Sequence, residues 1–304
     1  MRALVLLVLA ACTDAASSDS GLSAVLHVEA AQYRPGGFPR DTGGPPIAQV
    51  STQSSAVVIG AFDGVGRGVL APNATASVLA IEGIDGAWII PAGVPDLDTE
   101  GQPVARFAFG VIGDITPGPF TLVMAASDAT GNFGAPATTT IVAAEAVPPT
   151  GQLVLGLAWS GPADLDIHVV DALGGEAWSD KPNTMIPPPP GTPIDPNSME
   201  HLKHGQLDRD ANRACTRQTS PSEHVIWQMP PQPGEYIVRV DTRSMCGAAS
   251  ANWYVEAYVL GADGAMELVG AARGTATPAD TLHGLDQLGL GRAGLGVTAL
   301  RLTL

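Results

Sequence analysis

Charge is scarce in this chain, and positive charge is the scarcer sign. Only 15% of the 304 residues are charged, against about one quarter in an average globular protein. The 15 Lys and Arg compare with 30 Asp and Glu, which gives a formal net charge of −15. A general nucleic-acid binder needs a basic patch, so this class is excluded. An acidic surface is instead compatible with solubility outside the cell and with divalent cations.

Long apolar runs and long amphipathic helical patterns are also missing. The apolar run from Ala3 to Leu9 is too short to span a bilayer, and no later stretch of the roughly 20 residues needed is present. The 36 Gly and 26 Pro make up about a fifth of the chain, a density typical of short strands separated by turns. We therefore expect an all-β protein, and its length favours two domains.

Cysteine occurs only three times, and the first one stands in an informative position. Met1 and Arg2 precede an apolar run that ends in Leu9-Ala10-Ala11-Cys12. A charged start, a short apolar segment and small residues before a cleavage point are typical of a secretory signal. Because the Cys directly follows Ala-Ala, the segment resembles the lipobox of bacterial lipoproteins. An ordinary cleaved signal is the alternative.

The lipobox resemblance implies a location. It predicts a signal peptide at residues 1–11 and a lipidated N-terminus at Cys12. The membrane partner would be reached through this anchor, in which more than one acyl chain gives stable attachment. Thr13 stands where an Asp would signal inner-membrane retention in enteric bacteria, so their sorting rule favours the outer membrane of the cell envelope. Residues 12–23, rich in Ser, Ala and Asp, are expected to form a flexible tether.

Residues 24–146 contain short strand-type runs bounded by Gly, Pro or Asp. The clearest pattern is a hairpin, with strands at 118–128 and 137–143 and turn residues at 128–132. This hairpin resembles the closing strands of bacterial immunoglobulin-like repeats, which often carry an Asp-x-x-Gly-Asn turn. We expect an immunoglobulin-like β-sandwich here, followed by a stiff linker at 147–151.

Residues 152–304 are expected to form a second domain, and spaced motifs in it resemble a family of exported bacterial β-domains. The segment Asp164-Leu165-Asp166-Ile167-His168-Val169 matches that family's Asp-Leu-Asp-Leu-His-Val strand. Further matches are Leu207 to Asp210, Asn212, Cys215, Glu223, Gly234 to Val240, Cys246, and Asn252-Trp253. The likeness extends to the jelly-roll pre-peptidase C-terminal domains of secreted proteases. It implies a jelly-roll-like β-sandwich, whereas most family members with this strand have no known function.

The remaining two cysteines belong to this pattern. If Cys12 carries lipid, Cys215 and Cys246 are left as a pair, and an oxidising compartment lets them form a disulfide. Two buried free thiols are the alternative. The disulfide is favoured because both positions recur in the resemblance.

Alternation along the matched strand places Asp164, Asp166 and His168 on one face. Two carboxylates about 7 Å apart on one strand repel each other unless something neutralises them. Calcium accepts six to eight oxygen ligands, and the loop carboxylates that would join such a site are Asp208, Asp210 and Glu223. The alternative is structural, with the strand carboxylates capping a turn, bonding loop amides or pairing with nearby arginines. Both interpretations stay open, and no cofactor other than Ca²⁺ is expected.

Catalytic motifs are missing from the sequence. It has no Gly-x-Ser-x-Gly elbow, no His-Glu-x-x-His pair and no phosphate-binding loop between a strand and a helix. We therefore expect a non-catalytic, lipid-anchored envelope protein for surface display, adhesion or ligand binding, with an unidentified glycan or protein ligand. One alternative is an accessory carbohydrate- or peptide-binding module of an exported hydrolase system, with Trp178 as a candidate glycan contact. Another is a structural protein without a small ligand.

Overall fold

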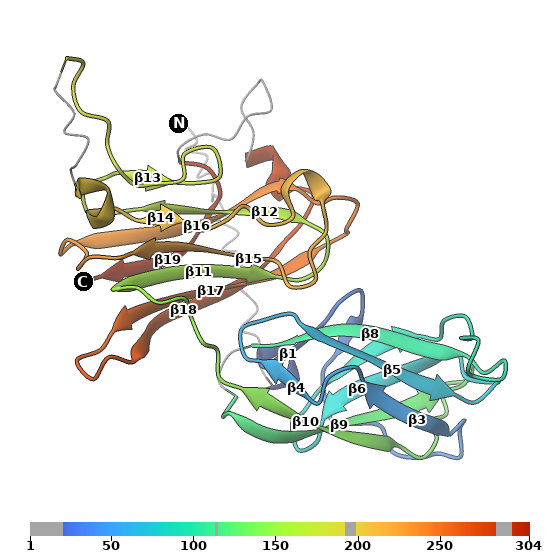
Figure 1. Ribbon diagram of the computed structural model, residues 1–304. Helices are drawn as coiled ribbons and strands as arrows, with labels where there is room; N and C mark the ends of the chain where they lie inside the picture. Colours follow the sequence, from blue (N-terminus) through green and yellow to red (C-terminus); the bar gives the residue numbers. More distant parts are fainter. Residues whose placement is uncertain (1–20, 113–114, 192–198, 284–293) are drawn as a thin grey trace, which may run out of the picture.

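The computed structural model describes residues 21–112, 115–191, 199–283 and 294–304. The predicted signal peptide, Cys12 and the tether up to residue 20 lie outside these described residues. Strands make up 48% of the structure and helices 5%, arranged as two β-sandwiches that follow each other along the chain (Figure 1). The prediction of an all-β protein with two sandwiches is confirmed.

The first sandwich is built from two sheets with mostly antiparallel pairing. In strand order, one sheet contains β1 (Leu26–Val28), β8 (Val104–Val111), β5 (Gly64–Leu70) and β3 (Ile47–Thr52). The other contains β2 (Gln32–Arg34), β7 (Ala87–Pro91), β6 (Ala76–Ile81), β9 (Gly118–Ser127), β10 (Ala137–Ala144) and β4 (Ala56–Val58). Between the sheets lies a core that includes Leu79, Phe107, Leu122 and Met124.

The strand order of this sandwich is immunoglobulin-like. Strands β5 and β8 pair in one sheet while β6, β9 and β10 lie side by side in the other, the arrangement of strands B and E and strands C, F and G. The predicted closing hairpin is β9–β10. Its turn is fixed by Asp128, whose Oδ1 accepts from the backbone N–H groups of Thr130 at 2.9 Å and Asn132 at 3.0 Å.

The predicted tether extends too far into the folded part of the chain. Residues Gly21–Ala24 form a short 3₁₀ turn, η1, and Leu22 is completely buried in the first core. The backbone N–H of Leu22 donates to Asp85 O at 2.7 Å. The sandwich therefore starts at residue 21 rather than 24, because a single apolar side chain secures a segment whose composition is otherwise polar.

The second sandwich packs two antiparallel sheets. The larger contains β14 (Gln206–Leu207), β15 (Ser222–Trp227), β11 (Leu153–Trp159), β17 (Ala251–Leu260) and β18 (Met266–Ala276). The smaller contains β13 (Glu176–Ala177), β12 (Asp164–Val170), β16 (Glu235–Ser244) and β19 (Val297–Thr303). Successive strands from β11 to β17 largely alternate between the sheets, the jelly-roll-like feature of this domain. Trp159, Trp227 and Tyr236 fill its core.

In the ranges that the structure describes, helical structure is limited to single turns. Besides η1, these are η2 (Glu200–Lys203), η3 (Arg213–Cys215) and η4 (Asp280–His283). Among the described residues, no helix has the length and apolar character that crossing a bilayer would require.

The two sandwiches are in contact with each other. Strand β10 ends at Ala144 and β11 starts at Leu153, on either side of the predicted linker. Phe62 and Ile112 of the first sandwich form a small buried cluster with Tyr254 of the second. Arg273 of β18 donates to Ala24 O at 2.6 Å. This junction becomes important below because a cavity lies beside it.

Candidate functional site

Strand β12 presents its acidic side chains on the face that points away from the core. Leu165 and Ile167 are fully buried between the sheets, whereas Asp164, Asp166 and His168 alternate with them. That second face is not open to solvent, because Asp164, Asp166 and His168 are only 3%, 1% and 0% exposed. Ser179 and Ala214 both bond the β12 carboxylates, so segments of the chain on either side of η2 cover them.

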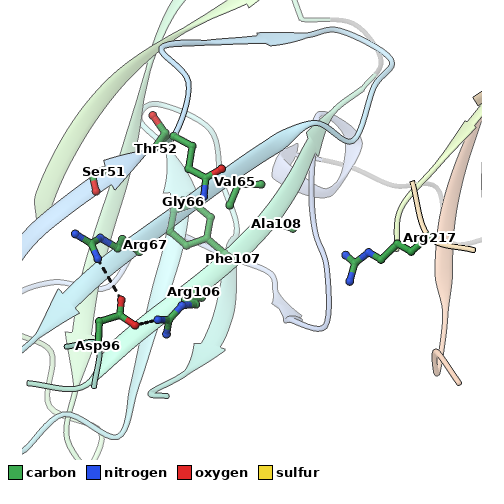
Figure 2. A pocket seen from close by; sticks show the side chains of 11 residues that line it. Ser51, Thr52, Val65, Gly66, Arg67, Asp96, Arg106, Phe107, Ala108 and Arg217 are labelled. Atoms are coloured by element: carbon green, nitrogen blue, oxygen red, sulfur yellow. Dashed lines mark hydrogen bonds and ion pairs between the residues drawn. The ribbon is translucent and has the colours of Figure 1, made fainter. Parts of the chain in front are cut away.

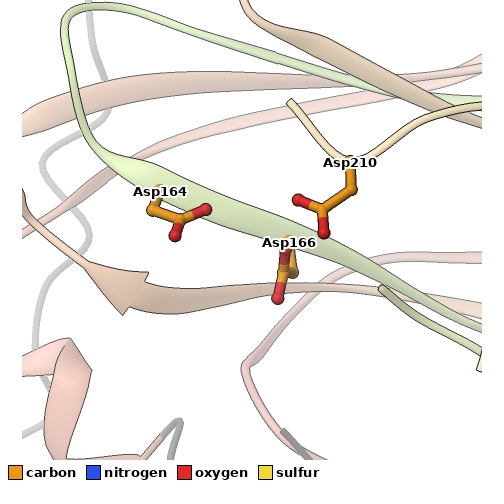
Figure 3. Close-up of side chains that lie close together, drawn as sticks. All are labelled: Asp164, Asp166 and Asp210. Carbon is orange, nitrogen blue, oxygen red and sulfur yellow. The ribbon is translucent and has the colours of Figure 1, made fainter. Parts of the chain in front are cut away.

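Three carboxylates meet over this strand. Asp164 and Asp166 lie next to each other on β12, and Asp210 approaches from a loop (Figure 3). One oxygen from each lies within 4.8 Å of the others. We call Asp164, Asp166 and Asp210 the Asp triad. In each of them, Oδ1 is buried and has no hydrogen-bond partner among the described residues. Such orphaned buried oxygens are uncommon in folded proteins and call for an explanation such as a bound ion.

The second oxygens of the two β12 carboxylates have structural partners. Asp164 Oδ2 accepts from the backbone N–H of Ala214 at 3.0 Å. Asp166 Oδ2 accepts from Ser179 Oγ at 2.8 Å and from Arg243 Nη1 at 3.3 Å. These bonds hold the carboxylates in place and leave one oxygen of each for another role. The structural and metal interpretations of the sequence thus apply to different oxygens of the same residues.

The electrostatics of the Asp triad favour a bound cation. Burial, followed by the neighbouring Asp166 charge, raises the pKa of Asp164 to about 6. The same two causes raise the pKa of Asp210. Arg243 partly offsets both effects. A raised carboxyl pKa means that the negative charge is unfavourable in this environment, and a cation between the oxygens would reverse that penalty.

A fourth acidic residue, Asp241, lies beside the Asp triad and was not anticipated from the sequence. It faces Asp166 across the β12–β16 pairing and is 1% exposed. Neither of its oxygens has a hydrogen-bond partner among the described residues. Burial raises its pKa to about 6, against the attraction of His168, whose Nε2 lies 3.8 Å from Asp241 Oδ2. Only the pairing of β12 with β16 would have indicated that Asp241 lies beside Asp166, and the sequence does not reveal this pairing.

Two predicted ligands do not join the Asp triad. Glu223 is fully buried, and its oxygens accept from the backbone N–H groups of Ile167 at 2.8 Å and Ala211 at 2.9 Å. Burial, and then the charge of Asp166, raises the pKa of Glu223 well above its ordinary value. Asp208 instead bonds His224, with 2.8 Å to its backbone N–H and 2.9 Å to Nδ1. Glu223 therefore links β12 to the loop of Asp210 through backbone hydrogen bonds. Asp208 lies at a different site.

The predicted disulfide between Cys215 and Cys246 is present, with a Cα–Cα distance of 5.5 Å. It joins the loop of Asp210 and η3 to the segment that follows β16. Within this loop, Asn212 takes a left-handed conformation and its Nδ2 donates to Ala163 O at 2.9 Å. Covalent and polar contacts thus fix the loop that brings Asp210 to the β12 face.

Trp178 is not a free aromatic platform. Its ring stacks on His168, with centroids 5.8 Å apart and planes 6° apart, and Lys181 Nζ lies 5.7 Å from its centroid. The candidate glycan contact therefore acts as part of the cover over the β12 face.

A groove of about 830 Å³ beside β5 and β8 gathers arginines in an otherwise acidic molecule (Figure 2). Arg67 and Arg106 both reach Asp96, with the Arg67 contact at 3.1 Å. Arg217, from the second sandwich, lies 3.8 Å from Glu29. Because these guanidinium groups already have carboxylate partners, we assign no ligand to this groove.

Comparisons with known proteins do not identify a function for this chain. No family model matches the chain, and no curated protein matches it. Among the solved structures with a similar chain is one described as "Complete structure of manganese lipoxygenase of Gaeumannomyces graminis and partial structure of zonadhesin of Komagataella pastoris". It is 11% identical, with a TM-score of 0.23, over 76% of this chain and 94% of that one. A score this low carries no argument about function, so the lipoprotein and pre-peptidase resemblances stay predictions.

Proposed function

We propose that this protein is a non-catalytic, lipid-anchored protein of the cell envelope that presents two β-sandwiches for ligand binding. In this proposal a calcium ion organises the second sandwich at the Asp triad. The observation that supports it is the Asp triad itself: one carboxylate oxygen from each of Asp164, Asp166 and Asp210 lies within 4.8 Å of the others, and each residue has a buried Oδ1 with no hydrogen-bond partner among the described residues.

Calcium is the cation that suits these ligands best. The Asp triad offers oxygen only, and Ca²⁺ prefers six to eight oxygens at about 2.3–2.6 Å in a flexible geometry. Asp241 adds two further oxygens without a hydrogen bond among the described residues, next to Asp166. Zinc favours Cys and His ligands, and His168 has its Nδ1 occupied by Glu176 at 3.1 Å. Water molecules would complete the coordination shell, as in many Ca²⁺ sites.

Calcium is therefore expected to stabilise the protein. If 1 mM Ca²⁺ is about 100 times the dissociation constant, binding adds roughly 2.7 kcal/mol, which corresponds to a rise in Tm of roughly 5–10 °C. The measurement is a calorimetric melt of EDTA-treated protein with and without Ca²⁺. Asp166→Asn should remove the rise, and Glu267→Gln, at an exposed position of β18, should keep it. If the Tm of the wild-type protein does not change in millimolar Ca²⁺, the proposed calcium site is wrong.

The anchor has its own test. In a Gram-negative host, the wild-type protein is expected in the membrane fraction with an acylated Cys12, which mass spectrometry of the N-terminal peptide detects. Cys12→Ser should move the protein to the soluble fraction of the envelope. Thr13→Asp, the matched control, should keep the acyl groups and shift the protein toward the inner membrane. Recovery of an unmodified N-terminus from the wild-type protein would overturn the anchor.

A further inference from the structure

A cavity of about 350 Å³ lies at the junction of the two sandwiches. Ligand pockets commonly measure about 300–1,000 Å³ and favour domain interfaces. From the first sandwich, the residues after β4 contribute, including Gly60, and Pro148 and Pro149 come from the linker. The outer face of the β15–β11–β17 sheet supplies the rest of the lining. We call this space the junction cavity.

The sheet register places two polar side chains on either side of a bare glycine. Gly156 of β11 pairs with His224 of β15 on one side and with Glu256 of β17 on the other. Paired residues on neighbouring strands project to the same face, and two strand spacings separate the outer pair by about 10 Å between Cα atoms. A Cβ on Gly156 would lie 3.1 Å from His224 Cδ2. The glycine thus leaves open the floor between the two polar groups.

His224 is held in a defined orientation. Asp208 Oδ2 lies 2.9 Å from His224 Nδ1, and a hydrogen bond at one ring nitrogen sets the role of the other. Ser222, two residues earlier on β15, also lines the cavity. The Ser222 hydroxyl accepts a hydrogen bond from Arg209 and is not hydrogen-bonded to the imidazole of His224. The nucleophile–base pair that acyl transfer requires is not formed, and the arrangement suits binding.

Among the described residues, Glu256 has no cationic partner. Burial raises its pKa to about 7, partly offset by a hydrogen bond from the Tyr258 hydroxyl. Gly60 of the first sandwich packs against it, since a Cβ there would lie 2.8 Å from Glu256 Oε1. No salt bridge reaches Glu256 in the part of the chain that the structure describes. Removing a carboxylate from water is costly unless it is paired.

We propose that the junction cavity binds a small primary amine with an apolar body. The ammonium group would pair with Glu256, where a charge-assisted hydrogen bond restores the solvation that burial removes. His224 would provide a second polar anchor across Gly156. The apolar body would lie against Val154 and the two linker prolines. The net charge of −15 favours the approach of such a cation over that of an anion.

This site shares no residue with the Asp triad, so the two proposals fail separately. The probe is phenethylamine, and its neutral control is 2-phenylethanol, which has a similar shape. Each is titrated into the folded protein at pH 8, where an alkyl amine is protonated, with NMR shifts as the readout. We expect saturable amine binding at least about tenfold tighter than alcohol binding, because hydrogen bonds to charged groups carry that much energy. Calcium and EDTA should give the same amine affinity.

Variants locate the site. Glu256→Gln should remove the preference for the amine, and Glu267→Gln, which loses the same charge on the neighbouring strand, should retain it. Gly156→Ala narrows the cavity floor and should weaken both probes, which gives a second test if the first variant does not fold. Equal affinity for amine and alcohol, amine preference that survives Glu256→Gln, or amine binding that EDTA abolishes would each overturn the proposal.

Discussion

Replacing Glu223 with alanine is expected to lower the free energy of unfolding by about 3 to 4 kcal/mol. The change leaves the backbone N–H groups of Ile167 and Ala211 without an acceptor. Each buried donor left unsatisfied costs about 1–3 kcal/mol. The lost packing of the Cγ methylene adds about 0.8 kcal/mol. Part of this loss is offset, because burial raises the pKa of Glu223 and removing the carboxyl relieves that unfavourable charge.

Urea denaturation monitored by tryptophan fluorescence measures this loss. Glu223→Gln should cost less than the alanine variant, since its amide oxygen still accepts one N–H while its NH₂ meets the other donor. Glu267→Ala on exposed β18 should stay within about 0.5 kcal/mol of the wild type. We also expect weaker Ca²⁺ binding in Glu223→Ala, because Ala211 adjoins Asp210. A Glu223→Ala protein as stable as the wild type would show that the two backbone hydrogen bonds of Glu223 contribute nothing to stability.

Opening the disulfide is expected to lower stability by about 3–4 kcal/mol. The two cysteines are 31 residues apart, and cross-linking a loop of that length restricts the unfolded chain by this amount in the entropy model. The corresponding fall in Tm is roughly 6–15 °C. Because the bond fixes the loop of Asp210 to the end of β16, calcium affinity should fall as well.

The double variant Cys215→Ser/Cys246→Ser separates the disulfide from any effect of free thiols. Calorimetric melts with and without a reducing agent should show a lower Tm for the reduced wild type, and no effect of the reductant on the double variant. If the reduced protein melts at the wild-type temperature and binds Ca²⁺ equally well, the loop is held by its hydrogen bonds alone.

The sequence was informative where the pattern is local. Alternation of Leu165 and Ile167 with Asp164 and Asp166 predicts both the core face and the acidic face of β12, and the Asp-x-x-Gly-Asn turn predicts the β9–β10 hairpin. Asp210 was expected from its spacing in the resembling motif. The predictions for β12 and for the β9–β10 hairpin need only the strand period and turn chemistry, whereas the one for Asp210 rests on the resemblance.

What the sequence could not show depends on long-range pairing. Asp241 becomes part of the acidic cluster only because β16 pairs with β12 in one register. Glu223 could be separated from the carboxylates of the Asp triad only by its two bonds to backbone amides. His224 and Glu256 face each other across Gly156 only after three strands are in place. The sequence predicts that Leu22 lies in the tether, because one apolar residue hardly changes the composition of a segment rich in Ser, Ala and Asp.

Most edge strands of the first sandwich are short. In the described part of the chain, β1, β2 and β4 have three residues each and occupy three of the four outer positions of its two sheets. A long, flat border exposes a row of backbone donors and acceptors that can recruit a neighbouring molecule. Borders this short offer few such groups. If the protein is anchored at high density, as proposed, these three borders of the first sandwich would therefore give neighbouring copies little opportunity to pair edge to edge.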